Sequence, residues 1–267
     1  MAKISANTGT LYGLGVGPGD PELITLKALR LLKAAPVIAY PAPEEGESLA
    51  RKIAAPHLPG GQTEIVIRMP LDASRFPAQA VYDRVAEEVA THLDAGRDVA
   101  ALCEGDPFFY GSFMYLFGRL AGDHRVEVVP GVTAATACAA ALGVPLTHRD
   151  HASAVTLVTG HGRDGEPELD WAALAGPRQT LAVYMGVAAA GRIAARLIAQ
   201  GLAPGTPVAV IENGTMADQK TAAGALRDLE ALVRDNGITG PALIIIGEVA
   251  RRAQAEALAE RPRALAV

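Results

Sequence analysis

The sequence predicts an α/β protein with two domains whose sheets are mainly parallel. Short apolar segments typical of buried strands alternate with longer segments in which apolar residues recur at helical spacing. The chain has 267 residues and is 50% hydrophobic, which is enough to fill two cores of ordinary size. The polar segment 144–150 interrupts the pattern, so we place the boundary there and expect domains at 1–149 and 150–267.

The elements of the first domain follow from hydrophobic periodicity. Strands are expected at residues 10–16, 37–40, 64–69, 99–103 and 126–129. Helices are expected at residues 22–33, 48–55, 78–95, 113–121 and 133–142. Pro41 interrupts the second strand, and Gly96 and Gly143 close helices. Such alternation is the pattern of a mostly parallel sheet.

The second domain repeats this alternation less regularly. Strands are expected at residues 155–159, 180–184, 207–211 and 242–246, and helices at 188–199 and 225–234. The polar run 216–222 follows the strand at 207–211 so closely that we expect it to return antiparallel.

Composition argues against several kinds of partner. The net charge is -5, and Lys and Arg are scattered among acidic residues, so no basic patch is available for nucleic acid. The chain contains no apolar run of about 18 residues and no apolar stretch near its N-terminus. We therefore expect no membrane span, no signal peptide and a cytoplasmic location.

The cysteines and histidines form no recognisable metal or nucleophile motif. Cys103 and Cys138 lack CxxC spacing, and His148, His151 and His161 do not follow a ligand pattern. The Gly-x-Ser-x-Gly elbow of α/β hydrolases is also missing. We predict no metal site and no covalent hydrolase chemistry.

Two glycine-containing corners follow predicted strands and are candidate ligand sites. The first is Gly13-Leu-Gly-Val-Gly-Pro-Gly-Asp-Pro21, and the second is Glu104-Gly-Asp-Pro107. Open α/β sheets bind ligands at the carboxyl ends of their strands. Pro18 stands where a GxGxxG motif has its third glycine and offers no N–H to a pyrophosphate, which disfavours dinucleotide binding.

Asp106 in the second corner has two interpretations. Its carboxylate can accept hydrogen bonds from ribose hydroxyls, or it can form a turn with the following proline. Five of the chain's eleven Phe and Tyr residues cluster beside it: Phe108, Phe109, Tyr110, Phe113 and Tyr115. Because aromatic faces suit a large planar ligand, we favour ligand contact.

These corners belong to a set of motifs through which the chain resembles the tetrapyrrole methylases over nearly its whole length. The motifs are at residues 15–27, 104–107, 129–134, 184–186, 212–215 and 241–247. Members of this family transfer a methyl group from S-adenosylmethionine to reduced tetrapyrroles in cobalamin and siroheme synthesis. The resemblance implies two α/β domains with a donor-binding cleft between them, S-adenosylhomocysteine as product, and a homodimer.

The resemblance also implies which residues bind the methyl donor. They are Pro18, Glu104, Gly105, Asp106, Phe109, Thr133, Ala134, Met185, Gly214 and Ala242. By motif matching, Gly105 and Asp106 hold the ribose and methionine parts, and the three residues of the second domain surround the adenine.

The two halves of the chain resemble different members of the family. Up to about Arg119 the sequence is similar to precorrin-2 C20-methyltransferases, which produce precorrin-3A. From about Pro145 onwards it is similar to uroporphyrinogen-III C-methyltransferases, which produce precorrin-2. In the second group the corner carries an arginine, a proposed proton acceptor, at the place of Ser112. We therefore predict precorrin-2 as substrate, with uroporphyrinogen III as the alternative and cobalt-factor II left open.

The catalytic base is not identified by the sequence. Tyr110, Ser112 and Tyr115 are candidates for lining the substrate site. Basic residues that are candidates for pairing with the substrate's carboxylates are Lys27, Arg68, Arg75 and Arg149. A non-catalytic tetrapyrrole carrier is an alternative of another class, although a carrier has no need of the complete set of donor motifs.

Overall fold

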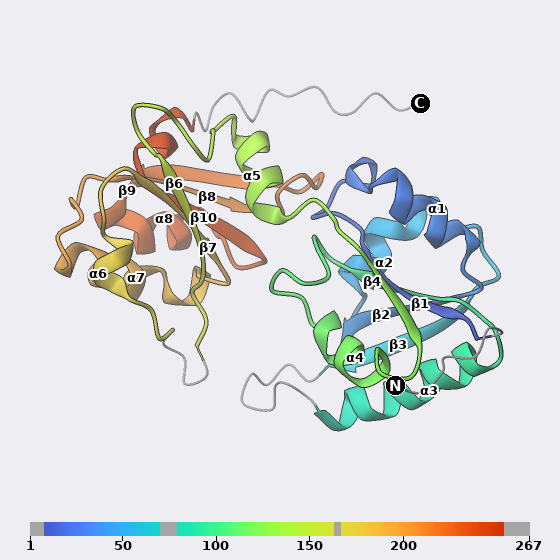
Figure 1. The fold of residues 1–267 in the computed structure, drawn as a ribbon. Coiled ribbons are helices and arrows are strands. Elements are labelled where there is room, and N and C mark those ends of the chain that lie inside the picture. Colours follow the sequence, from blue (N-terminus) through green and yellow to red (C-terminus); the bar gives the residue numbers. More distant parts are fainter. Residues whose placement is uncertain (1–7, 70–78, 163–166, 254–267) are drawn as a thin grey trace. The chain divides into compact units, whose positions relative to one another are not determined.

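A computed structural model describes residues 8–69, 79–162 and 167–253 and divides the chain into two compact units (Figure 1). The units are Met1–Thr133 and Ala134–Val267. Each contains its own sheet, and helices pack on both faces of each sheet. The predicted α/β class is confirmed.

The sheet of the first unit is entirely parallel, as predicted. Its strands lie in the order β3-β2-β4-β1-β5. Their bounds are β1 Thr10–Gly15, β2 Val37–Pro43, β3 Thr63–Met69, β4 Val99–Cys103 and β5 Arg125–Val129. Because all five run the same way, their carboxyl ends share one edge, and both candidate corners lie on it.

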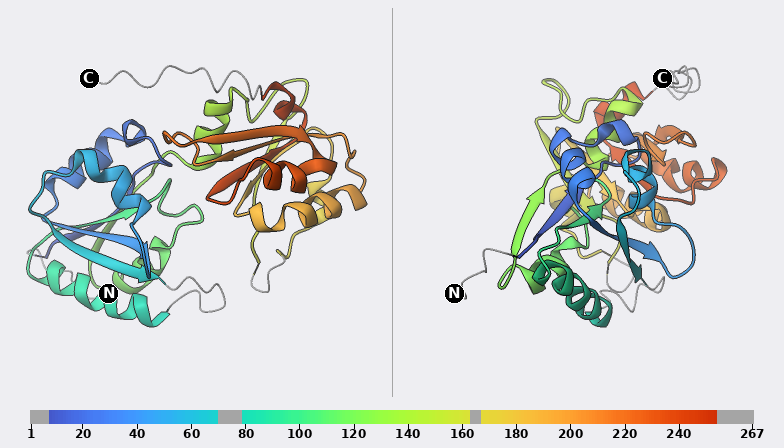
Figure 2. Two further views of the ribbon diagram at one scale, coloured as in Figure 1. Left: turned by 180° about the vertical axis from the view of Figure 1, so that it is seen from behind. Right: turned by 90° about the vertical axis from the view of Figure 1, so that its right-hand side faces the viewer.

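Helices cover both faces of this sheet. Helices α1 (Leu26–Ala34) and α2 (Leu49–Ala54) pack on one face, and α3 (Gln79–Asp94) and α4 (Phe113–Leu120) on the other (Figure 2). Helix α1 begins later than the predicted residue 22, because Pro21–Leu23 forms a separate 3-10 turn and Thr25 caps the helix. The Thr25 hydroxyl accepts a hydrogen bond from the Ala28 N–H at 3.2 Å.

The sheet of the second unit is mostly antiparallel, so the prediction of a mainly parallel sheet is wrong there. Its strands lie in the order β6-β7-β10-β8-β9. Their bounds are β6 Ala154–Thr159, β7 Gln179–Tyr184, β8 Pro207–Glu212, β9 Lys220–Ala225 and β10 Ala242–Ile246. Only β6 and β7 pair in parallel.

A single reversal of the chain explains this difference. The turn 213–219 is too short for a crossover, so β9 returns antiparallel to β8. The antiparallel return was expected at 216–222, and the strand lies later, at Lys220–Ala225. Helix α8 (Leu229–Asp235) then carries the chain back, and β10 inserts between β7 and β8 in the reversed direction. The periodicity of β10 contains no information about this direction.

Helix α5 (Ala134–Leu142) belongs to the second unit, whereas the sequence placed it before the boundary at 149/150. Its apolar side packs against Ile211 and Ile245 of the second sheet. The opposite face of that sheet is covered by α6 (Trp171–Leu174), α7 (Ala190–Ala199) and α8. No helix in the described part of the chain has the length and apolar character that crossing a membrane requires.

Candidate functional site

Three strand ends of the first sheet meet at Gly15, Gly105 and Gly131. A Cβ atom on Gly15 or on Gly131 would overlap the Gly105 carbonyl oxygen. A Cβ on either of these two glycines would also overlap the backbone of the other, so neither position has room for a side chain. The loops after β1, β4 and β5 are thereby held in direct backbone contact at the carboxyl edge of the sheet.

The Gly-Pro-Gly loop after β1 joins this group through its backbone. The Gly105 N–H donates to the Gly17 carbonyl oxygen at 2.8 Å, which places the half-buried Pro18 beside the corner after β4. Asp20 ends the loop, and its carboxylate accepts from the Glu22 N–H at 2.8 Å. The structure therefore brings Pro18, Gly105 and Asp106 together.

Asp106 connects two of these loops through its carboxylate. One oxygen accepts from the Phe108 N–H at 2.9 Å, and the other accepts from the Gly131 N–H at 3.0 Å. The contact with the Phe108 N–H forms the turn that the sequence offered as the alternative to ligand binding. The contact with the Gly131 N–H was not predicted. A carboxylate oxygen accepts two hydrogen bonds, so each retains capacity for a ligand hydroxyl. Phe109 follows in the same turn, its N–H donating to the Asp106 carbonyl oxygen at 3.3 Å.

Glu104 precedes this corner and has an unusual carboxyl group. Desolvation raises its pKa, and a hydrogen bond with the Ala50 backbone opposes that shift only in part. The residue as a whole remains exposed. The neutral form is thus favoured more than at an ordinary glutamate.

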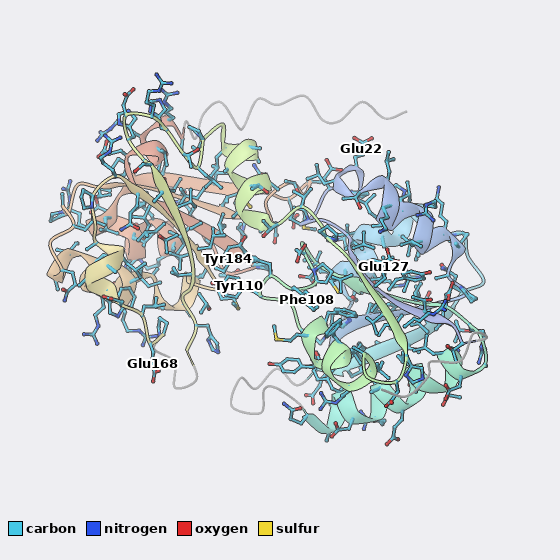
Figure 3. The ribbon with its side chains drawn as sticks, in the orientation of Figure 1. Glu22, Phe108, Tyr110, Glu127, Glu168 and Tyr184 are labelled. Carbon is cyan, nitrogen blue, oxygen red and sulfur yellow. The ribbon has the colours of Figure 1, made fainter. Side chains whose placement is uncertain are left out.

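Large apolar side chains are exposed on the segment between β4 and α4, where Figure 3 labels Phe108 and Tyr110, and on the first turn of α4. Phe108, Tyr110 and Met114 are 47%, 43% and 45% exposed. Tyr110 has a φ of 51°, a conformation that costs energy for a residue with a side chain and recurs at ligand-binding segments. The predicted aromatic cluster is therefore partly a solvent-facing surface and not only core.

A cavity of about 190 Å³ opens at the carboxyl ends of β2, β3 and β4. Tyr110, Ser112, Glu104 and Cys103 line it together with Tyr82 of α3. Of the three substrate-site candidates, Tyr110 and Ser112 are on its wall, whereas Tyr115 packs its ring 5.0 Å from that of Tyr82. Sequence analysis missed Tyr82, because its helical spacing marks it only as a core residue.

In the second unit, the predicted adenine contacts lie on one edge of the sheet. Met185 follows β7, Gly214 follows β8, and Ala242 begins β10 between those strands. Three residues here have positive φ angles: Met185 at 53°, Asn213 at 49° and Thr215 at 74°. Such conformations persist only where the surrounding structure enforces them, and they are common at ligand-binding sites.

Hydrogen bonds and close packing hold the turn after β8 in this form. The Asn213 side chain donates to Asp218 at 3.0 Å, and the Thr215 N–H donates to the Gln219 side chain at 2.8 Å. Gly214 sits against the Cys138 sulfur of α5, where a Cβ would overlap it. Burial raises the pKa of the Cys138 thiol to about 12, so it packs as a neutral group.

Glu212 is a buried carboxylate that sequence analysis matched to a motif without giving it a role. It is 2% exposed, accepts from the Thr239 N–H at 2.7 Å and from the Gly240 N–H, and pairs with Lys220 at 2.9 Å. Desolvation alone would raise its pKa, but the hydrogen bonds from Lys220, Gly240 and Thr239 outweigh it and the pKa is lowered. Glu212 thereby fixes the loop that leads into Ala242.

Two further donor-site candidates lie where the two units join, and two of the basic candidates already have partners within the first unit. Thr133 and Ala134 join the two units, and the next N–H, of Ala135, donates to the Tyr184 hydroxyl at 2.8 Å. Lys27 pairs with Glu127, and Arg68 donates to the Pro43 and Gly46 carbonyl oxygens.

The other two basic candidates, Arg75 and Arg149, and the predicted absence of a metal site concern different parts of the chain. Arg75 lies outside the described residues, and the Arg149 carbonyl oxygen accepts from Arg178 at 2.6 Å. His148 and His151 stack at 4.6 Å. Among residues 8–69, 79–162 and 167–253, no cluster of three or more His, Cys, Asp or Glu is arranged to hold a metal ion.

Comparison with known proteins agrees with this geometry. The chain matches the family described as Tetrapyrrole (Corrin/Porphyrin) Methylases over residues 10–230. It is 42% identical over 248 residues to a siroheme synthase of Pseudoalteromonas translucida, covering 91% of this chain and 49% of the relative. A siroheme synthase of Pseudomonas fluorescens is 38% identical, with 91% and 50% covered. The chain thus spans about half the length of these relatives.

Solved structures show the same architecture. A cobalt precorrin-4 methyltransferase superimposes with a TM-score of 0.78 at 29% identity, covering 90% of this chain and 95% of that one. A uroporphyrin-III C-methyltransferase from Thermus thermophilus, in complex with S-adenosylhomocysteine, has a TM-score of 0.72 at 31% identity, with 91% and 99% covered. The fold defines a two-unit α/β protein in which glycine-lined strand ends gather at one edge of the first sheet. The chain belongs to the tetrapyrrole methylase family.

Proposed function

We propose that this protein is an S-adenosylmethionine-dependent C-methyltransferase that acts on a reduced tetrapyrrole. The observation that carries the proposal is the contact of Gly15, Gly105 and Gly131, which joins three loops of the family's motif set at one strand edge. The complex of the Thermus thermophilus relative with S-adenosylhomocysteine supports the choice of donor.

The donor is proposed to bind through the residues that the motifs indicate. In the first unit these are Pro18, Glu104, Gly105, Asp106, Phe109 and Thr133. In the second unit they are Ala134, Met185, Gly214 and Ala242. Gly105 and Met185 have positive φ angles, and the Gly105 N–H donates to the loop after β1, so parts of this set lie in tight loops.

The reaction proposed is direct displacement at the sulfonium methyl group. A nucleophilic ring carbon forms the new C–C bond while the C–S bond breaks, S-adenosylhomocysteine leaves, and the substrate then loses a proton. Alignment and exclusion of water account for most of the acceleration, because the sulfonium is already a strong electrophile. The exposed apolar surface of Phe108, Tyr110 and Met114 is suited to one face of the macrocycle.

The preferred substrate is precorrin-2, methylated at C20 to give precorrin-3A. The specific observation is the corner after β4, where Ser112 stands in place of an arginine and opens onto the cavity. Uroporphyrinogen III is the second candidate, favoured by the similarity to siroheme synthases and to a uroporphyrin-III C-methyltransferase.

The two substrates can be separated directly. The purified protein is offered precorrin-2 or uroporphyrinogen III anaerobically with isotopically labelled donor, and the position of the methyl group is read by NMR. We expect one methyl group at C20 of precorrin-2. Methylation of uroporphyrinogen III instead would assign the chain to the second candidate.

Binding of the donor tests the class of function. Calorimetry with S-adenosylhomocysteine should give saturable binding, and absence of binding at high micromolar ligand would leave the non-catalytic carrier as the better explanation.

The variant Ser112→Arg should reduce methylation of precorrin-2 while leaving donor affinity near that of the wild type. Tyr115 is left unchanged in this variant because its ring packs on Tyr82.

A further inference from the structure

The cavity at the ends of β2, β3 and β4 contains a buried hydroxyl group that the donor site does not use. Tyr82 is 1% exposed, and its hydroxyl lies near the Ser112 side chain but completes no hydrogen bond of standard geometry with any described residue. Leaving such a group unpaired in a protein interior costs about 1–3 kcal/mol. A ligand that enters the cavity and accepts a hydrogen bond from this hydroxyl would recover that free energy.

The Tyr82 side chain is fixed in its position. Its ring lies 5.0 Å from the Tyr115 ring, and the Arg119 guanidinium is 5.9 Å from its centre. Arg119 is itself held by Asp83 at 2.7 Å and by the Tyr115 carbonyl oxygen at 2.9 Å. The hydroxyl therefore cannot turn towards another partner without disturbing the packing of α3 on α4.

The chemistry of the cavity is that of a hydrogen-bond donor in apolar walls. Desolvation raises the pKa of Tyr82, and the nearby Ser112 hydroxyl offsets only part of this shift, so the phenol stays protonated and donates. Ile67, Phe113 and Leu116 supply apolar surface. Glu104 lines the same cavity, where desolvation raises the pKa of its carboxyl group.

Position and size limit what can enter. The cavity lies beside neighbouring strands β2 and β4, whose following helices, α2 and α4, pack on opposite faces of the sheet. Open α/β sheets bind ligands at such a position. Its volume is about 190 Å³. That space accommodates a short acid side chain but not a macrocycle.

We propose that this cavity binds one carboxylic side arm of the tetrapyrrole, with the hydroxyls of Tyr82 and Ser112 as donors to its carboxyl oxygens. The proposal rests on the proposed function, because it is the acetate and propionate arms of such a substrate that present carboxyl groups at its rim. The apolar walls contact the methylene groups of the arm. Tyr82 is then a substrate-binding residue that fixes which edge of the macrocycle meets the methyl donor.

The test is the variant Tyr82→Phe, which removes the hydroxyl and keeps the ring. We expect at least a tenfold rise in KM for the tetrapyrrole, with kcat changed much less and the affinity for S-adenosylhomocysteine unchanged. The melting temperature should stay the same or rise, because an unpaired buried hydroxyl is lost.

Thr180→Val is the matched control. Thr180 is 0% exposed, its hydroxyl is also without a partner in the described part of the chain, and it does not line the cavity. This variant should gain stability without any change in KM.

An unchanged KM in the Tyr82→Phe variant would overturn the inference, whatever happens to the melting temperature. With active wild-type protein, this result leaves the proposed function in place. A lower melting temperature with unchanged KM would assign the hydroxyl a structural role. Failure of the wild type to methylate any tetrapyrrole is a different outcome, because it removes the proposed function itself.

Discussion

Asp106 in the first unit and Glu212 in the second occupy equivalent places, and each joins the end of a strand to a loop far along the chain. Asp106 follows β4 and accepts from the N–H of Gly131, 25 residues later. Glu212 ends β8 and accepts from the N–H of Thr239, 27 residues later. In each unit a carboxylate fixes the distance between two backbone segments at the edge where we propose that the donor binds.

The two carboxylates differ in their exposure. Glu212 is 2% exposed and has Lys220 opposite it in the β8–β9 ladder, so its hydrogen bonds are part of the interior. Asp106 is half-buried at a strand edge. Loss of Glu212 should therefore reduce stability first, and loss of Asp106 should reduce ligand binding first.

The largest effect is expected for Glu212→Ala. This variant leaves the Thr239 and Gly240 N–H groups without their acceptor, and a hydrogen bond to a charged group contributes about 1.5–3 kcal/mol to the unfolding free energy. Lys220 loses one partner but keeps the Gly237 carbonyl oxygen. Urea denaturation followed by circular dichroism measures the loss. Glu212→Gln is the control, because its amide oxygen can still accept from both N–H groups. A loss below 1 kcal/mol in Glu212→Ala would contradict the structural role.

The next effect is expected at the glycine contact of the first unit. A Cβ on Gly131 would overlap backbone atoms of Gly105 and Gly15, so Gly131→Ala should cost about 1–3 kcal/mol and abolish binding of S-adenosylhomocysteine. Gly118→Ala is the matched control, since that position lies within α4 with open space around it and should gain about 0.5–1 kcal/mol. Normal donor binding by Gly131→Ala would show that the contact tolerates separation.

Asp106→Asn should have little effect on stability and a clear one on the donor. The amide keeps one acceptor oxygen but turns a donor towards a backbone N–H, which loosens the corner and removes the charge. We expect the Kd for S-adenosylhomocysteine to rise about tenfold, consistent with a charged hydrogen bond of about 1.5–3 kcal/mol. Unchanged affinity would reduce Asp106 to a turn-forming residue.

The smallest effect is a pH dependence of stability. The pKa of Glu212 is lowered in the folded protein, so its contribution is present above the ordinary glutamate pKa and declines as pH falls through the folded value. Unfolding free energy measured between neutral and acidic pH should fall less steeply for Glu212→Gln than for the wild type. Parallel curves would indicate that other groups dominate.

The sequence predicted the first unit well because its information is local. Each strand there is followed by a helix, so periodicity and glycine corners are sufficient to place the strand ends. In the second unit, the insertion of β10 between β7 and β8 depends on one reversal at 213–219, and no local pattern records it. The roles of Glu212 and Tyr82 depend in the same way on partners distant in sequence.

The chain's two cysteines have a practical consequence. One is in each unit, and both are buried: Cys103 at the cavity and Cys138 behind Gly214. Burial raises the pKa of both thiols, so neither supplies the reactive thiolate while its unit is closed. The rate at which each cysteine is alkylated, measured by peptide mass spectrometry, would therefore report the rate of local unfolding of its own unit, without any introduced label.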